Sequence, residues 1–296
     1  MSTMSGDNGN RMLRPAPPLR RNVTRTRVIA VRDGTPLERP DQLATEEPME
    51  IRAGGPGQEP VGVAVTMRTP GNDFELAVGF LLTEGLIRSR DEVVSVTYCE
   101  LPPDEQQYNV VTVRLTHPFD SSSIQRNFYA TSSCGICGKA SLEQVQVSCG
   151  PLAPGPVVSS EAILGLPGAL ANGQRIFEQT GGLHAAGLFD AAGGLLSLRE
   201  DVGRHNALDK LVGQAVLAGD VPLAKAVLLV SGRVSFEIVQ KAAVAGIPIV
   251  CAVSAPSSLA VQAGEGLGLT IVGFLRGRGF NVYTHPERVR IRTPRR

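Results

Sequence analysis

Residues 226–274 read AVLLVSGRVSFEIVQKAAVAGIPIVCAVSAPSSLAVQAGEGLGLTIVGF. Three apolar runs, at residues 226–230, 247–253 and 269–274, alternate in this stretch with two segments of helical spacing, each opened by a serine. Continuous apolar runs of this length are typical of strands that are buried on both faces, and serine is a good helix N-cap. The stretch therefore predicts a βαβαβ unit with a mostly parallel sheet.

The carboxyl ends of these three strands predict where a ligand binds, because open α/β sheets hold ligands beyond that edge. The strands run into Ser-Gly-Arg at residues 231–233, into Ser-Ala-Pro-Ser-Ser at 254–258 and into Leu-Arg-Gly-Arg-Gly at 275–279. Glycine lets a ligand approach the backbone, while hydroxyls, helix N-termini and arginines bind phosphate oxygens. A phosphorylated or nucleotide-bearing ligand is predicted, since turn formation alone would not account for the arginines.

The N-terminal half has a different pattern. Short strands are predicted at residues 28–32, 49–52, 61–67, 93–98 and 110–115, with one helix from Asn72 or Asp73 to Gly85. A Pro- and Gly-rich stretch at 151–156 is typical of a domain boundary. We therefore predict a disordered basic tail at residues 1–27, an α+β domain at 28–155 and an α/β domain at 156–296.

A C-x-x-C motif provides the most reactive groups of the chain. Cys134 and Cys137 flank Gly-Ile in a glycine-rich segment that predicts a mobile loop. The thiolate is the nucleophilic form of cysteine, and the nearby Lys139 and a helix start predicted at Ser141 would favour it. Structural zinc, dithiol redox exchange and sulfur transfer all use such a pair.

The sequence around the motif argues against zinc binding, dithiol redox exchange and zinc-dependent deamination. Zinc needs about four ligands, and the nearest further cysteine is Cys149, without a second C-x-x-C. Redox exchange would need a strand-to-helix junction, whereas this pair follows a polar loop. Zinc deaminases combine H-x-E with P-C-x-x-C, but Ser133 precedes Cys134 here and His184 is followed by two alanines.

Composition narrows the class of protein. The chain has 296 residues, a formal net charge of +1, five cysteines, no tryptophan and 42% hydrophobic residues. A near-neutral charge with few aromatic residues argues against nucleic-acid binding, and an odd cysteine count argues against a secreted disulfide scaffold. Without an apolar run long enough to span a membrane or an export signal, we expect a cytoplasmic protein.

Two histidine-containing segments remain open to more than one interpretation. His184 stands among small and apolar residues, where a buried structural histidine is the default. Residues 199–210, REDVGRHNALDK, place Arg204, His205 and Asp209 around a predicted helix start. Such a density of ionisable groups is typical of a functional site, but helix capping by Asp201 or Asn206 would explain part of it.

Five motifs taken together resemble the formate dehydrogenase accessory sulfurtransferases, the FdhD family. They are GNDFELAVGFLLTEG at residues 71–85, SSCGICG at 132–138, TGGLHAA at 180–186, REDVGRHNALDK at 199–210 and SGRVSFE at 231–237. The resemblance covers most of the chain beyond residue 27. It implies a C-terminal domain with a cytidine-deaminase-like fold and without zinc, so that no metal ligand is expected.

The resemblance also implies a function. A protein of this family takes persulfide sulfur from a cysteine desulfurase and transfers it to the molybdenum bis(molybdopterin guanine dinucleotide) cofactor, which formate dehydrogenase then receives. Cys134 matches the persulfide-forming cysteine, with Cys137 assisting or sharing the sulfur. The cofactor is a bound substrate, and a homodimer is suggested. The expected cofactor-binding residues are Phe274, Leu275, Arg276, Gly277, Arg278 and Gly279, joined by Ser231, Gly232 and Arg233 from the strand-end analysis. A zinc-dependent nucleotide hydrolase of the deaminase type is the alternative.

Overall fold

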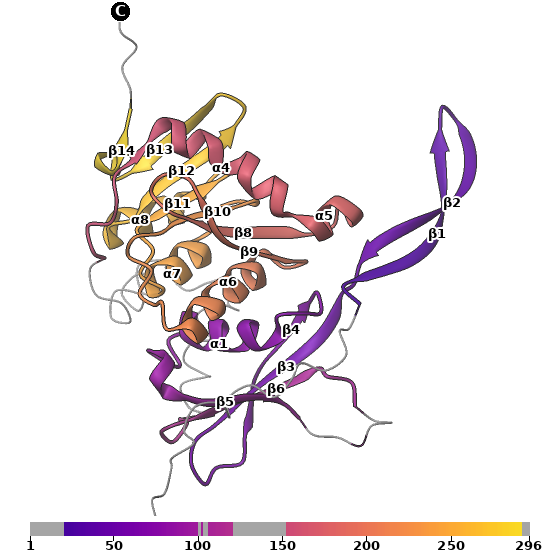
Figure 1. Ribbon diagram of the computed structural model, residues 1–296, viewed down its shortest axis with the longest axis vertical. Helices are drawn as coiled ribbons and strands as arrows, with labels where there is room; N and C mark the ends of the chain where they lie inside the picture. Colours follow the sequence, from indigo (N-terminus) through magenta and orange to yellow (C-terminus); the bar gives the residue numbers. More distant parts are fainter. Residues whose placement is uncertain (1–20, 100–101, 103–105, 121–151, 292–296) are drawn as a thin grey trace, which may run out of the picture.

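The computed structural model describes residues 21–99, 102, 106–120 and 152–291. Its largest sheet has six strands in the order β13-β12-β11-β10-β8-β9 (Figure 1). Their bounds are His184–Phe189 (β8), Leu195–Asp201 (β9), Val227–Val230 (β10), Ile249–Ala252 (β11), Thr270–Arg276 (β12) and Gly279–Thr284 (β13). Strands β10, β11 and β12 are parallel and are joined by α7 (Phe236–Val244) and α8 (Ser258–Leu267). The predicted βαβαβ unit is therefore confirmed. The prediction of a mostly parallel sheet is wrong for the sheet as a whole, because β8, β9 and β13 join it in antiparallel pairs.

Helices cover both faces of this sheet. Helix α6 (Arg204–Ala218), α7 and α8 pack on one face, and α4 (Ser160–Gly173) packs on the other. Within β10, Leu228 and Val230 belong to the core under α6 and α7, while Val227 and Leu229 belong to the core under α4. Both sides of the strand are buried, which explains why its sequence is uniformly apolar.

The N-terminal half forms a second sheet of four strands in the order β4-β3-β6-β5. The strands are Glu47–Gly54 (β3), Val61–Arg68 (β4), Val93–Tyr98 (β5) and Val110–Leu115 (β6), and helix α1 spans Asp73–Thr83. Met49, Leu76, Leu211 and Ile238 belong to one buried cluster that includes both sheets and the helices between them. The α+β and α/β regions therefore share a continuous hydrophobic core.

Two glycines set the distance between the halves. Helices α1 and α6 lie side by side (Figure 1), and Gly79 of α1 meets Gly213 of α6 at their contact. A Cβ atom at Gly79 would overlap the carbonyl oxygen of Asp209, and a Cβ at Gly213 would overlap that of Glu75. Glycine is thus required at both positions because the two backbones are in direct contact.

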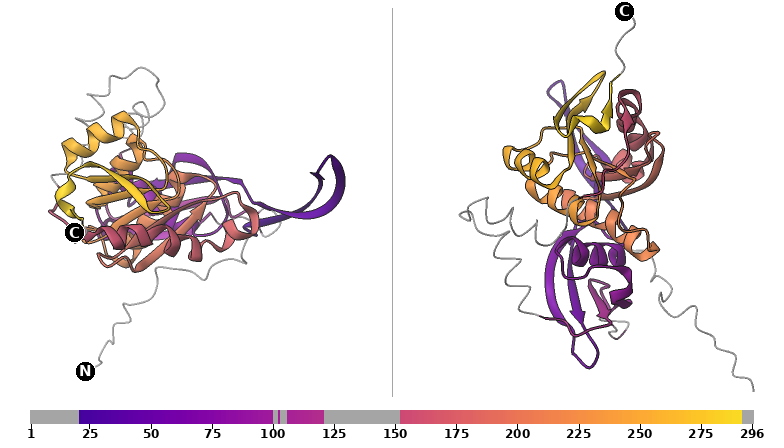
Figure 2. Two further views of the ribbon diagram at one scale, coloured as in Figure 1. Left: turned by 90° about the horizontal axis from the view of Figure 1, so that it is seen from above. Right: turned by 90° about the vertical axis from the view of Figure 1, so that its left-hand side faces the viewer.

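A two-stranded arm extends from the body (Figures 1 and 2). It consists of β1 (Val23–Arg32) and β2 (Thr35–Ala44), which pair antiparallel along their full length. Strand β1 thus begins inside residues 21–27 of the predicted disordered tail. The β-branched residues Val23, Thr24 and Thr26 favour an extended backbone there.

Shorter elements complete the chain. They are β7 (Val158–Ser159), α5 (Arg175–Thr180), β14 (Val289–Arg290) and the 3₁₀ turns Arg90–Glu92 and Pro286–Arg288. Strands β7 and β14 pair with each other. None of the helices in the described ranges is long and apolar enough to cross a membrane.

Candidate functional site at the carboxyl edge of the six-stranded sheet

Four strands end at one edge of the large sheet. Strands β10, β11 and β12 are parallel, and β9 has the same direction because β8 is antiparallel to both β10 and β9. Helices α6, α7 and α8 each begin just after one of these strand ends. Three helix N-termini therefore point to the edge where the sequence predicted the ligand, which makes it favourable for anions.

The segment after β10 is held in place by backbone contacts. The Ser231 hydroxyl oxygen accepts a hydrogen bond from the Ala185 amide at 2.9 Å, and the Ser231 amide donates to the Ala185 carbonyl at 2.9 Å. Gly232 lies against the side chains of His184 and Arg204, and Arg233 is exposed. Ser231 thus fixes the loop, which leaves Arg233 available to a ligand.

The segment after β11 contacts the end of β12. The Phe274 amide donates to the Ser254 carbonyl at 3.0 Å, and the parallel bridge between Val234 and Pro256 ties the loops after β10 and β11 together. The Ser257 side chain caps α8 by accepting from the Ala260 amide at 3.2 Å. The three predicted strand-end segments are thus adjacent in the structure.

Residues 274–279 form the outer end of this edge. Phe274 has a positive φ of 53° where β12 departs from regular pairing with β13, and Gly277 has a φ of 61° in the turn between these strands. The Arg276 guanidinium lies over the Phe274 ring, 5.7 Å from its centroid. Arg278 is exposed, whereas the Leu275 side chain is fully buried under α4. Leu275 can therefore offer a ligand only its backbone.

Two further side chains line the edge beside Gly232. Burial lowers the pKa of His184, and the positive charge of Arg204 adds to this effect. The Nε atom of Arg204 is buried and has no hydrogen-bond partner in the described part of the chain. A buried unpaired donor is costly, so an anion bound here would satisfy it. From the sequence alone, His184 is expected to be a structural residue. It lies near the end of β10 because β8 pairs with β10, and this pairing is not visible in the sequence.

Much of the segment 199–210 has a structural role instead. The buried Asp201 carboxylate pairs with Lys210 at 2.7 Å and accepts from the amides of Thr69 and Gly203 at 3.1 and 2.8 Å. Arg199 pairs with Glu75 at 2.5 Å. Asp201 therefore does not act as the N-cap, which is Gly203. These groups fasten α6 and β9 to the N-terminal half.

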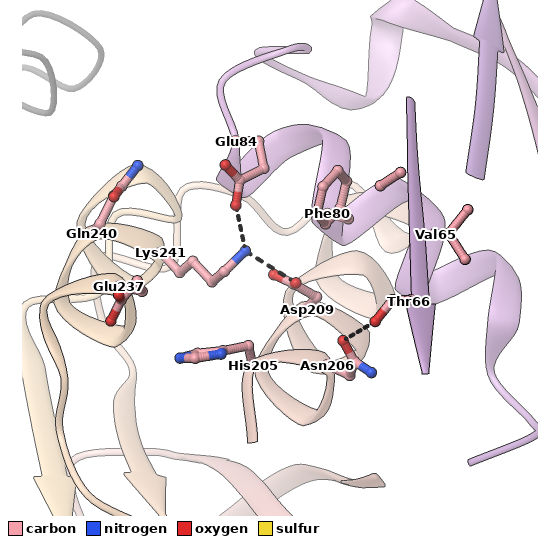
Figure 3. Close-up of a pocket in the computed structure, with 11 residues that line it drawn as sticks. Val65, Thr66, Phe80, Glu84, His205, Asn206, Asp209, Glu237, Gln240 and Lys241 are labelled. Carbon is pink, nitrogen blue, oxygen red and sulfur yellow. Dashed lines mark hydrogen bonds and ion pairs between the residues drawn. The ribbon is translucent and has the colours of Figure 1, made fainter. Parts of the chain in front are cut away.

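A buried ion cluster lies between the halves (Figure 3). Lys241 Nζ lies 2.9 Å from Glu84 Oε1 and 3.0 Å from Asp209 Oδ2, and it donates to the Thr83 hydroxyl at 2.9 Å. Burial opposes the charge of Lys241, but attraction to Asp209 and Glu84 outweighs this and raises the pKa of Lys241. The lysine is therefore a charged structural link between α7, α6 and α1.

Replacing Lys241 with methionine should strongly destabilise the fold. The change would leave the buried Asp209 carboxylate without the cation that it contacts at 3.0 Å, and removing one partner of a buried ion pair costs about 3 to 5 kcal/mol. Denaturant unfolding would measure this loss. The exposed Lys225→Met serves as the control, and equal unfolding midpoints for the two variants would contradict the proposed role of Lys241.

A cavity of about 310 Å³ adjoins this cluster. Its walls combine the edge of β4 at residues 64–66 with side chains of α1, α6 and α7, including Phe80, His205, Glu237 and Gln240. Two of its lining residues are hydrogen-bonded, since the Thr66 hydroxyl donates to Asn206 Oδ1 at 3.1 Å. Burial, followed by the nearby charges of Arg204 and Lys241, lowers the pKa of His205 to about 4. His205 is therefore a neutral imidazole at neutral pH.

Acid should destabilise the protein through His205. Its pKa falls from 6.5 in the unfolded chain to about 4 in the folded chain, so the unfolded state binds the proton first as the pH drops. His205 therefore costs no stability above pH 6.5 and progressively reduces it down to about pH 4. The loss should reach about 2 kcal/mol, allowing for partial solvent exposure. Denaturant unfolding across this range should show a smaller decline for His205→Gln; identical declines would rule out His205 as the source.

The remaining predictions from the sequence concern the cysteine residues and metal binding. Cys134 and Cys137 lie outside the described residues. Cys251 lies in β11 and is fully buried, which raises its pKa to about 12, as expected for a core residue. Within the described ranges, no group of three or more His, Cys, Asp or Glu side chains comes together in a way that could hold a metal ion.

Comparison with known proteins relates this chain to one family. The FdhD/NarQ family matches residues 44–290. A sulfur carrier protein FdhD from Streptomyces coelicolor is 51% identical over 276 residues, covering 90% of this chain and 96% of that relative. One from Mycobacterium tuberculosis is 49% identical over 264 residues, covering 86% and 93%.

A solved structure agrees with this result. The crystal structure of a protein from Desulfotalea psychrophila, assigned as a formate dehydrogenase accessory protein, matches with a TM-score of 0.70 and 25% identity. The match covers 92% of this chain and all of that one. From the family match and the extent of the sequence identity, we conclude that the chain belongs to the FdhD/NarQ family.

Proposed function

We propose that the protein is a sulfur carrier that accepts sulfur from a cysteine desulfurase and delivers it to the molybdenum bis(molybdopterin guanine dinucleotide) cofactor of formate dehydrogenase. The names of its relatives support the sulfur-carrier role, and the formate dehydrogenase accessory assignment of the similar structure supports the recipient. One observation carries the cofactor part of the proposal. Four strand ends and three helix N-termini meet at one edge together with Arg204, Arg233, Arg276 and Arg278.

Cys134 would carry the sulfur. Its thiolate attacks the outer sulfur of the donor's persulfide, a new S–S bond forms on Cys134, and the desulfurase cysteine leaves as a thiolate. Transfer onward as sulfide requires two electrons. The thiolate of Cys137 can supply them by attacking Cys134, which yields a disulfide and releases hydrosulfide. This assigns Cys137 an assisting role in the second step.

The carboxyl edge of the sheet would hold the nucleotide ends of the cofactor. Arg233, Arg276 and Arg278 are exposed and suited to phosphate oxygens. The Phe274 ring, with Arg276 over it, is suited to stacking with a purine base. Binding energy from these remote groups would then position the molybdenum centre for sulfur transfer.

We also propose that residues 156–296 form a deaminase-like domain. The mixed six-stranded sheet, covered by helices on both faces and with its candidate ligand edge at the strand carboxyl ends, supports this relation. In this interpretation the domain keeps a nucleotide-binding edge and uses it to anchor a cofactor.

Removing the arginines should weaken nucleotide binding. Each charge-assisted contact to a phosphate contributes about 1.5 to 3 kcal/mol, so Arg276→Ala and Arg278→Ala should each raise the dissociation constant for GDP about tenfold or more. Isothermal titration calorimetry would measure this. Arg290→Ala, an equally exposed arginine of β14, is the matched control. If all three variants bind GDP like the original chain, the proposed edge is not the nucleotide site.

A further inference from the structure

The cavity beside the buried ion cluster has a negatively charged lining. It is lined by three carboxylates and one ammonium group, those of Glu84, Asp209, Glu237 and Lys241 (Figure 3). His205 is neutral there, so the lining carries two net negative charges. The charge of Arg204, which acts on Glu237, offsets part of them. A positively charged occupant is therefore favoured over a neutral or negative one.

The strand edge that borders the cavity offers backbone hydrogen bonds. Strand β4 is an outer strand of its sheet. The Met67 carbonyl accepts from Asn206 Nδ2 at 2.7 Å, so it points away from β3. By the two-residue alternation of a strand, the peptide groups of Val65 point the same way, and they have no partner in the described chain. An occupant with peptide groups of its own can pair with them.

Apolar surface lies next to these polar groups. Ala64 and Phe80 line the cavity, and Val65 is 72% exposed. An occupant that fits all three features is a peptide in which basic and apolar side chains follow one another.

The chain contains such a peptide before its first described residue. Residues 1–20 lie outside the described ranges, and residues 11–14 among them read Arg-Met-Leu-Arg, without an acidic residue between positions 8 and 20. A guanidinium group matches a carboxylate with two parallel hydrogen bonds. Methionine and leucine between the two arginines suit the wall formed by Ala64 and Phe80.

The segment begins close enough to reach the cavity. The Asn22 carbonyl accepts from the Thr45 amide at 3.0 Å, and Glu47, two residues further along, pairs with Arg68 of β4. At about 3.3 Å per strand residue and about 5 Å between strands, the path from Asn22 to Val65 is roughly 27 Å. The eight residue steps from Asn22 back to position 14 can span up to about 28 Å, and the eleven steps to position 11 about 38 Å.

We propose that residues 11–14 dock in this cavity of their own chain and pair with the Val65 edge of β4. One arginine then lies at Glu237 and the other at the net negative cluster of Glu84, Asp209 and Lys241. The docked segment shields an edge strand that is otherwise open to pairing with other chains. The proposal does not depend on sulfur transfer, because neither the cysteine motif nor the nucleotide edge enters its test.

Photocross-linking of the full-length protein locates the segment. A photoreactive amino acid in place of Leu13 should cross-link to residues 64–66 and 237–241. In a mixture of ¹⁵N-labelled and unlabelled protein, both ends of each link should carry the same label, because the segment docks on its own chain. The control places the photoreactive group at Thr293, in the basic segment 292–296, and should give no links to the cavity.

Charge removal tests what holds the segment. The double variant Arg11→Ala/Arg14→Ala should lower the yield of cavity links at least about threefold, and Glu237→Gln should lower it from the receiving side. Glu265→Gln, the same change at an exposed residue of α8, should preserve the yield. The arginine variant leaves the described fold untouched, so it tests the proposal even if Glu237→Gln alters the fold.

Four results would each overturn the proposal. They are the absence of cavity links from position 13, an equal yield of such links from Thr293, links between differently labelled copies, and a yield that is unchanged by the arginine double variant.

Discussion

Replacing Cys134 with alanine should abolish the activation of formate dehydrogenase and leave GDP binding unchanged. The thiolate is the only proposed attachment point for sulfur, so its loss leaves no acceptor for the desulfurase. The nucleotide contacts belong to a different part of the chain, at residues 231–233 and 274–279. The two properties should therefore separate in one variant.

Activity assays of formate dehydrogenase matured with each variant, together with GDP titrations, measure this separation. Cys99→Ala is the matched control, because Cys99 is a partly exposed free thiol outside the motif and its loss should preserve both properties. Retained activation by Cys134→Ala, or loss of activation and GDP binding together, would contradict the division of labour between thiol and nucleotide edge.

Replacing Gly79 or Gly213 with alanine should have the largest effect on stability. A methyl group at either position would overlap a backbone carbonyl of the opposing helix, and backbone cannot move aside as a side chain can. Separating α1 from α6 would disturb the core that joins both halves. We expect each variant to lose at least about 3 kcal/mol of unfolding free energy.

Thermal and denaturant unfolding measure this effect, and α4 supplies the control. A Cβ at Gly165 meets no atom within 4 Å, so Gly165→Ala should stabilise the protein by up to about 1 kcal/mol through higher helix propensity. Opposite signs for Gly79→Ala and Gly165→Ala are the expected result. A neutral Gly79→Ala would show that the helices can separate without cost.

Local sequence patterns predicted those helices and strands whose conformation is favoured by the residues within the element itself. The buried strands and crossover helices of residues 226–274 can be predicted from the sequence, because the apolar runs, the N-cap serines and the glycines at the helix ends all indicate the same elements. Strand β2 is different, since TPLERPDQLA contains two prolines and alternates poorly. Its extended form follows from pairing with β1, and a pattern within one strand cannot reveal that.

The roles of some site residues could not be predicted because they depend on the order of the strands in the sheet. Strand β8 enters the sheet antiparallel between β10 and β9, and its position brings His184 to the strand-end site. Likewise, Asp201 binds the Thr69 amide from far away along the chain. The density of charged groups at residues 199–210 was visible in the sequence, but its largely structural use depends on these long-range contacts.

The meeting of the strand ends at one edge was more predictable. Arg233 and Arg276 follow parallel strands, and the carboxyl ends of such strands necessarily lie at one edge. The sequence could not show that Leu275 is buried or that Arg204 presents an unpaired donor there. Those properties depend on the packing of α4 and on the start of α6 beside Gly232.

The most direct test of the sulfur-carrier account is intact mass spectrometry of the protein after incubation with a cysteine desulfurase and cysteine. The original chain should gain the mass of one or more sulfur atoms, and a thiol reductant should remove this added mass. Cys134→Ala should gain none. An original chain without added sulfur, or an equal gain in Cys134→Ala, would contradict the account.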